Sequence, residues 1–146
     1  MNYKTTFRRN PGPTGAAKLS RYVSRGPNGM ADGSATVTDQ RGHELVFEDV
    51  ERFQEFAAES EMSRQHCFAF EAEHEPDDLI DATTDALDGE LDGEYMVACH
   101  KDSENPHIHV AEAGAESDLT MGPEDIGRVR SSVADATGES IGEGVK

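Results

Sequence analysis

The sequence contains no tryptophan and only two cysteines among its 146 residues. Cys67 and Cys99 alone do not form a disulfide framework, so a reducing cytoplasm is the expected compartment. No apolar run approaches the ~20 residues of a membrane-spanning helix, and the basic N-terminal stretch lacks the apolar segment of a secretory signal. The length predicts one domain over residues 1–138, followed by a flexible tail over residues 139–146.

Basic residues are scarce, with 13 Lys and Arg against 30 Asp and Glu, for a net charge of −17. Such a charge destabilises a compact domain in dilute salt. At about 1 M salt the Debye length falls to roughly 3 Å, and the repulsion is largely screened. The composition therefore predicts a protein of a salt-loving cell, such as a haloarchaeon, with a high-salt cytosol. Clear apolar periodicity argues against the alternative of a disordered chain.

Acidic residues are absent from the first 31 positions, which instead carry six basic side chains: Lys4, Arg8, Arg9, Lys18, Arg21 and Arg25. A basic segment on an acidic body is suited to hold an anion, and phosphate is the obvious one. The alternative is a basic arm that only neutralises the acidic face of its own molecule.

Apolar periodicity predicts an α+β fold, with a central antiparallel sheet of about five strands covered by helices. Residues 34–47 are expected to form a two-stranded hairpin that turns at 39–42. Further strands are expected at 65–73, 94–100 and 106–113, and residues 2–9 are a candidate sixth strand. Helices are expected at 16–26, at 47–62, from Pro76 onward, and from about Pro123 to Gly138. The hairpin makes antiparallel pairing the expected arrangement.

Three histidines fall within ten residues, in the stretch "HKDSENPHIHV". Residues two apart in a strand point to the same face, so His107 and His109 project together while Ile108 turns into the core. His100 ends the preceding strand, and the loop between the two strands is short enough to let them pair. Three neutral imidazoles can bind a divalent metal and leave positions open for substrate, which favours a catalytic site over a structural one.

Other interpretations of the histidines remain open. They could form a solvated cluster, or a closed zinc site could recruit a fourth ligand from His66, His74, Cys67 or Cys99. Cys99 is expected to point away from His100, and His43 in the hairpin is expected to be an ordinary surface residue. If the chain binds a nucleic acid, three aromatic residues could stack on its bases. Aromatic residues more commonly lie in the core, which is the alternative for these three: Phe68, Phe70 and Tyr95.

Tyr22 lies on a predicted helix within the basic region, flanked by Arg21 and Arg25. A phenol with a pKa near 10 is a weak nucleophile at neutral pH. A phosphodiester polarised by a metal and arginines is the kind of electrophile that such a group attacks. The alternative is that Tyr22 packs in the core with Leu19 and Val23.

Taken together, these motifs resemble those of HUH endonucleases, and most closely those of conjugative relaxases of the mobilisation-protein type. The pattern H-x6-H-x-H is similar to their metal motif, and "YVSR" within "AAKLSRYVSRG" looks like the helix that carries their tyrosine. The order of elements, from tyrosine helix to histidine strand to final helix, is similar over about residues 14–137.

The resemblance implies metal-dependent, site-specific nicking and strand transfer of single-stranded DNA. Tyr22 would attack the scissile phosphate to give a 5′-phosphotyrosine and a free 3′-hydroxyl. His100, His107 and His109 would hold a divalent cation, Mg²⁺ or Mn²⁺ first and Zn²⁺ as an alternative. The expected protein partners are accessory mobilisation or replication proteins, and no interaction with a membrane is expected.

Two further groups of residues follow from the same resemblance and from the charge pattern. Carboxylates expected to orient the histidines are Glu71, Glu73 and Asp102. Basic side chains expected to contact DNA phosphates are Arg8, Arg9, Lys18, Arg21 and Arg25.

Three alternative functions remain. A rolling-circle replication initiator would use the same chemistry, whereas a non-catalytic DNA-binding or structural protein would keep only the fold and the metal site. A hydrolase of small phosphoesters would use metal-activated water and would not need Tyr22. The orientation of Tyr22 discriminates, because its hydroxyl should face the histidines in a nicking enzyme and pack in the core otherwise.

Overall fold

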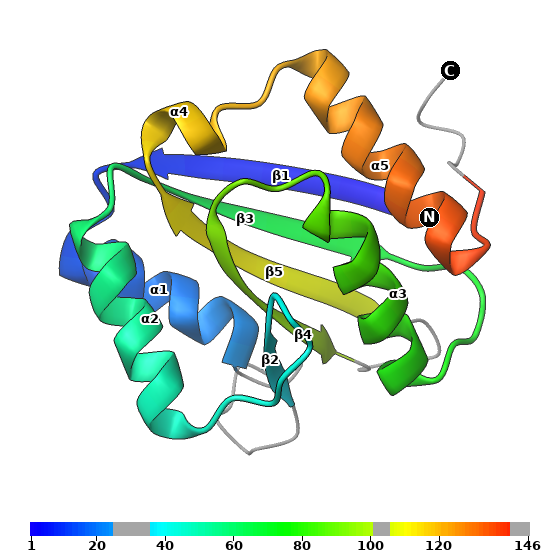
Figure 1. The fold of residues 1–146 in the computed structure, drawn as a ribbon, viewed down its shortest axis with the longest axis horizontal. Coiled ribbons are helices and arrows are strands. Elements are labelled where there is room, and N and C mark those ends of the chain that lie inside the picture. The colour runs from blue at the N-terminus through cyan, green and yellow to red at the C-terminus, as the bar shows by residue number, and fades with distance from the viewer. Residues whose placement is uncertain (25–35, 101–105, 141–146) are drawn as a thin grey trace.

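The computed structural model describes residues 1–24, 36–100 and 106–140, which form an antiparallel sheet with helices on both faces (Figure 1). Its five strands are β1 (Asn2–Arg9), β2 (Val37–Asp39), β3 (Met62–Ala69), β4 (Glu94–His100) and β5 (His107–Gly114). They lie in the order β1-β3-β5-β4-β2, and all neighbours are antiparallel. The predicted α+β fold with a five-stranded antiparallel sheet is confirmed.

Four long helices and one short helix pack around the sheet: α1 (Gly12–Ser24), α2 (Phe47–Glu59), α3 (Pro76–Asp88), α4 (Glu116–Leu119) and α5 (Pro123–Thr137). Alternation along the strands divides the core in two. Phe68 and Ile108 belong to the cluster that includes α3 and α5, whereas Ala98 and Ala111 belong to the cluster that includes α1 and α2. Small side chains on the second face allow α1 to pack closely on β4 and β5.

Several predicted boundaries hold and others were wrong. The helices predicted at 16–26 and 47–62 are α1 at Gly12–Ser24 and α2 at Phe47–Glu59. Pro76 begins α3, and Gly138 ends α5 in the left-handed region with φ 72°. The strand predicted at 65–73 is β3, which ends at residue 69. The second arm of the hairpin is reduced to a single bridge at Glu44, because α2 begins only three residues later, and the fifth strand is instead the N-terminal β1.

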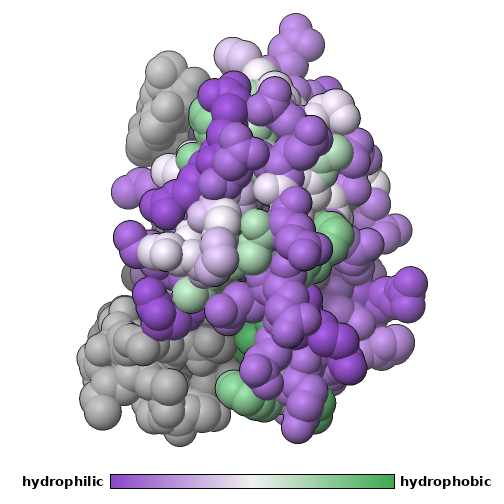
Figure 2. Space-filling view, turned by 90° about the vertical axis from the view of Figure 1, so that its left-hand side faces the viewer, coloured by the Kyte–Doolittle hydropathy of each residue, from purple (hydrophilic) through white to green (hydrophobic). Residues whose placement is uncertain are grey.

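Hydrophilic side chains predominate on the face of the molecule drawn in Figure 2, with small hydrophobic patches between them. Within the described ranges, no helix is both long enough and apolar enough to span a bilayer.

Glu139 attaches the end of the described chain to the domain. Its carboxylate accepts hydrogen bonds from the backbone N–H groups of Glu71 (3.0 Å) and Ala72 (3.1 Å) and from His74 Nε2 (2.8 Å). The ammonium group of Met1 lies 3.5 Å from Oε1. Burial by itself would raise the pKa of Glu139, but the hydrogen bonds and the ammonium charge together lower it below its usual range.

The substitution Glu139→Gln is expected to lower the free energy of unfolding by about 1–2 kcal/mol at neutral pH, because a charged acceptor is lost. The folded-state pKa of Glu139 is lower than its unfolded-state pKa. The carboxylate therefore stabilises the fold above the unfolded-state value of about 4.3 and stops doing so as pH falls through the folded-state value. Urea unfolding of both proteins between neutral and acid pH should show the difference disappearing. The exposed Glu73→Gln is the control, and an equal loss there would contradict the assignment.

Candidate functional site

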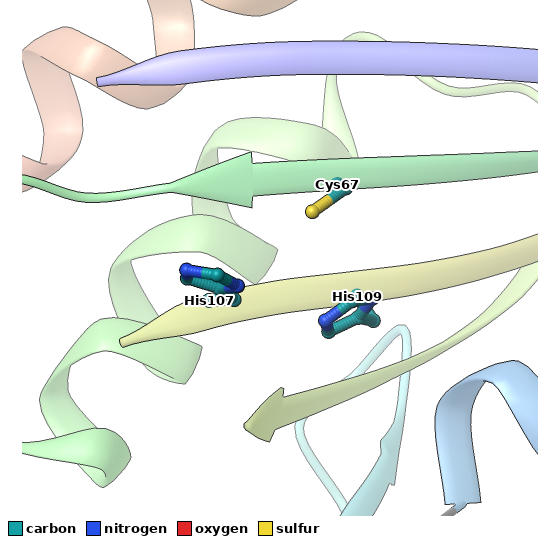
Figure 3. Close-up of side chains that lie close together, drawn as sticks. All are labelled: Cys67, His107 and His109. Atoms are coloured by element: carbon teal, nitrogen blue, oxygen red, sulfur yellow. The ribbon is translucent and has the colours of Figure 1, made fainter. Parts of the chain in front are cut away.

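The face of the sheet covered by α1 carries a group of three potential metal ligands. His107 and His109 alternate along β5 with the buried Ile108. Cys67 on β3 is the register partner of His109. One ligand atom from each of Cys67, His107 and His109 lies within 4.8 Å of the others (Figure 3). One thiol and two imidazoles could hold a divalent ion while leaving a coordination position for another group.

His100 lies beside this group. The predicted pairing of its strand with the next one is confirmed, and His100 is the register partner of His107. Its ring lies against that of His109, with centroids 4.1 Å apart. Its Nε2 donates a hydrogen bond of 2.8 Å to the Val23 carbonyl, which leaves only Nδ1 for a metal. The three predicted histidines are thus neighbours, but Cys67 and not His100 completes the compact group.

Tyr22 faces the same group from α1. Its ring forms a T-shaped pair with that of His109, with centroids 4.8 Å apart and planes at 79°. Its hydroxyl donates a hydrogen bond of 2.9 Å to the His66 carbonyl. Burial, together with the neighbouring Cys67 thiol, raises the pKa of Tyr22. The half-buried hydroxyl is therefore protonated at neutral pH, and it lies beside one of the candidate ligands, Cys67.

The thiol of Cys67 also lies in a partly buried position. Desolvation raises the pKa of Cys67, although Lys4 and the Tyr22 hydroxyl act in the opposite direction. A metal binds the thiolate and not the thiol, so binding here would release a proton.

The side chain of His66 points to the opposite face of the sheet, although its carbonyl accepts from Tyr22. Its Nε2 donates to Glu112 Oε1 at 2.8 Å, and its Nδ1 lies 2.7 Å from the Tyr3 hydroxyl. The second carboxylate oxygen, Oε2, accepts from the backbone N–H of Gly93 at 3.1 Å. His66, Glu112 and Tyr3 are all buried, so this is a polar network within the core and no part of the ligand group.

The other candidates for a fourth ligand lie elsewhere. His74 binds Glu139. Cys99 packs against the α3 and α5 cluster, on the far side of the sheet from His100, as predicted. The side chain of His43 is 74% exposed, which confirms that it is a surface residue. The core prediction is also confirmed for the three aromatic residues, which are all buried: Phe68, Phe70 and Tyr95.

Of the three carboxylates expected to orient the histidines, the two that the structure describes are not placed to do so. Glu71 and Glu73 follow the end of β3 and are exposed, because that strand ends before them. Among the described residues, no hydrogen bond or ion pair joins either one to a histidine of the group. The remaining predicted residues, Arg25 and Asp102, and positions 141–146 of the expected tail lie outside the described residues.

The predicted phosphate-binding residues that the structure describes are separated by the fold. Arg8 and Lys18 line one cleft. Arg9 points to the opposite face of β1, as alternation requires, and its Nε donates to Glu116 at 2.7 Å. Arg21 is exposed on α1. Lys4 belongs to the same basic segment but not to the expected phosphate contacts, and it lies directly opposite Cys67 across β1 and β3.

Cys67 is the member of the group that the sequence does not identify as a primary ligand. The alternation of β3 does indicate that Cys67 and Phe68 point to opposite faces. The pairing of β3 with β5, and the register that places Cys67 beside His109, come from long-range strand pairing and have no local signal.

No protein-family model matches the chain, and a search of curated proteins finds no significant match. The assignment of a function therefore depends on the geometry described above.

Proposed function

We propose that this chain is a metal-dependent enzyme that nicks and transfers single-stranded DNA, of the HUH relaxase type, with Tyr22 as the nucleophile. One observation carries the proposal: the Tyr22 hydroxyl lies beside Cys67, and its ring lies against His109. Nucleophile and candidate metal ligands therefore share one site. The acid-rich composition suits a high-salt cytosol, where the enzyme would act with accessory mobilisation or replication proteins.

In the proposed reaction, Oη of Tyr22 forms a bond to the phosphorus of a DNA phosphodiester, and the bond from phosphorus to the 3′ oxygen breaks. The phenolic proton ends on the departing oxygen, which leaves a 5′-phosphotyrosine and a free 3′-hydroxyl. A divalent cation at the ligand group would polarise the phosphate. The hydrogen bond from His100 to the Val23 carbonyl holds the end of α1 on β4, so His100 acts as a positioning residue for the adjacent Tyr22.

The ligand types bear on which metal the site takes. Magnesium and manganese prefer oxygen ligands, whereas zinc and cobalt accept one thiolate and two imidazoles readily. Cys67 is therefore the physical reason to place Zn²⁺ ahead of the Mg²⁺ or Mn²⁺ that the resemblance suggests.

Titration with Co²⁺, a spectroscopic substitute for zinc, tests the ligand group independently of activity. The substitutions Cys67→Ser and His107→Ala are each expected to lower the affinity by roughly a hundredfold or more, since losing a ligand costs more than losing an outer hydrogen bond. Only Cys67→Ser should also remove the near-ultraviolet thiolate charge-transfer band. His43→Ala, which removes an exposed histidine, should bind normally. If His100→Ala abolished binding while Cys67→Ser retained it, the ligand set would be the three histidines.

The proposed activity is tested by a covalent-adduct assay. The protein would be incubated in molar KCl with Zn²⁺ or Mn²⁺ and a randomised single-stranded DNA labelled at its 3′ end. Denaturing gels and the mass of the labelled tryptic peptide should reveal DNA attached to the Tyr22 peptide, and a chelator should prevent the attachment. DNA cleavage without an adduct, or an adduct on another residue, would overturn the proposal.

One observation favours a second candidate, a non-catalytic DNA-binding protein that keeps the metal site. The Tyr22 hydroxyl already donates to the His66 carbonyl, as a structural tyrosine would. In that case the metal should raise the midpoint of thermal unfolding and DNA should bind, while no adduct forms under any metal.

A further inference from the structure

A small cleft of about 140 Å³ lies between the edge strand β1 and helix α1. Its polar and small lining residues are Thr6, Arg8, Gly15, Lys18, Ser63 and Gln65. Arg8 faces Ser63 across β1 and β3, and Thr6 faces Gln65, so two adjacent rungs of the sheet form the floor. The Arg8 side chain crosses α1 at Gly15, where an added Cβ would come within 3.3 Å of Nη1. A glycine at this position leaves room for the guanidinium.

The charge of this cleft is opposite to that of the molecule. Among its described lining residues, two are basic and none is acidic. Another cleft formed by described residues is lined by three acidic residues and no basic one: Glu51, Glu55 and Glu59. A further cleft has a mixed lining of three acidic and two basic residues: Asp39, Asp49, Glu94, Arg41 and Arg52. A guanidinium, an ammonium, two hydroxyls and an amide, with no carboxylate among them, are the groups with which proteins bind phosphate.

The cleft lies on the same face of the sheet as the candidate functional site, a short distance away along both α1 and β3. Lys18 precedes Tyr22 by four residues on α1, a rise of about 6 Å. Gln65 precedes Cys67 by two residues on β3, a rise of about 7 Å. Lys4, opposite Cys67, adds another cation to the same face of β1. Helix and strand thus give the same separation between cleft and ligand group, roughly the length of one nucleotide in an extended strand.

We propose that the cleft formed by Arg8 and Lys18 binds the DNA phosphate adjacent to the one at Tyr22, so that the single strand runs along the groove between β1 and α1. This inference rests on the proposed function for its assignment to DNA. In molar salt, long-range attraction and counterion release contribute little to binding. A preformed cleft with directed hydrogen bonds retains more of its affinity under those conditions, which suits a DNA-binding protein with an acidic surface.

The test measures binding of a short fluorescent oligothymidylate by polarisation over a range of KCl concentrations. Wild type and all variants would carry Tyr22→Phe to prevent cleavage. The double substitution Arg8→Gln with Lys18→Gln is expected to weaken binding about tenfold at the lowest salt. It should also reduce the slope of log affinity against log salt by about 0.7 for each phosphate that the protein no longer neutralises. The control, Arg9→Gln with Arg52→Gln, removes the same charge from exposed side chains outside the cleft and should change affinity by less than about threefold.

The outcomes separate this inference from the proposed function. Equal losses in the cleft variant and the control, or no oligonucleotide binding by the parent protein, would overturn the inference. If the cleft variant loses affinity selectively but the protein with Tyr22 intact forms no adduct, the cleft binds DNA and the nicking proposal fails. If an adduct forms and the cleft variant binds like the control, nicking stands and the cleft assignment fails.

Discussion

The substitution Tyr22→Phe is expected to abolish the covalent DNA adduct while leaving metal binding and single-stranded DNA binding intact. Phenylalanine keeps the ring that contacts His109 and removes only the oxygen that would bond to phosphorus. The rate of adduct formation should fall by at least about a thousandfold, because no other group takes the place of a lost nucleophile in the same geometry. The variant also loses the hydrogen bond to the His66 carbonyl, so a destabilisation of about 1 kcal/mol should accompany the change.

Tyr3→Phe is the matched control. Tyr3 is buried and its hydroxyl also bonds to His66, but it lies on the opposite face of the sheet. This variant should form the adduct at nearly the wild-type rate. An adduct that persists in Tyr22→Phe, or one that is lost equally in both variants, would exclude Tyr22 as the nucleophile.

The same pair of variants distinguishes a nicking enzyme from a phosphoesterase that uses activated water. An activated phosphodiester such as bis-p-nitrophenyl phosphate needs no DNA site. Hydrolysis of this substrate that survives Tyr22→Phe and needs the metal would indicate the phosphoesterase. No hydrolysis together with a Tyr22-dependent adduct would indicate the nicking enzyme.

The substitution Glu112→Ala is expected to lower the free energy of unfolding by about 3–5 kcal/mol, the largest effect on stability anticipated for this protein. Glu112 is fully buried and accepts from both His66 and the Gly93 backbone. Removing its carboxylate leaves two buried donors without their acceptor and creates a cavity. Urea denaturation in molar KCl would measure the loss, with the exposed Glu94→Ala as control.

A double-mutant cycle separates the pairing of His66 with Glu112 from simple burial. Replacing both residues by apolar ones, as His66→Phe with Glu112→Leu, should cost less than the sum of the single substitutions, since it leaves neither member of the pair buried without the other. The Gly93 N–H and the Tyr3 hydroxyl lose a partner in the single and the double variants alike, so these losses cancel in the cycle. Additive losses would show that the two side chains stabilise the fold independently. A loss below about 1 kcal/mol for Glu112→Ala would show that the network contributes little.

This network also holds in place a strand segment that contributes to the candidate functional site on the other face of the sheet. The side chain of His66 bonds to Glu112, its carbonyl accepts from Tyr22, and Cys67 is the next residue. The buried bonds therefore anchor the part of β3 that carries both a candidate ligand and the acceptor of the Tyr22 hydroxyl. Variants of Glu112 that still fold should for this reason also weaken Co²⁺ binding.

Local sequence patterns determined much of this protein. A period of two placed His107 and His109 on one face with Ile108 on the other, and it correctly turned Cys99 away from His100. Pro76 and Gly138 marked helix ends because the first cannot continue a preceding helix and the second tolerates a left-handed backbone. These signals act between neighbours in the chain, so they can be read without knowing the fold.

Only the tertiary structure decided which side chains meet. Strand pairing joins β3 to β5 and brings Cys67 beside His109 across about 40 residues of chain, and no local pattern encodes that register. The predicted strand at 65–73 was wrong at both ends for the same reason, since its pairing with β1 and β5 begins at Met62 and ends at Ala69. The packing of α1 on the sheet then directed Tyr22 toward the ligand group. Alternation along a strand depends on one segment of the chain, whereas register and packing depend on how two segments pair. The chemistry proposed here depends on that pairing, which the local sequence does not encode.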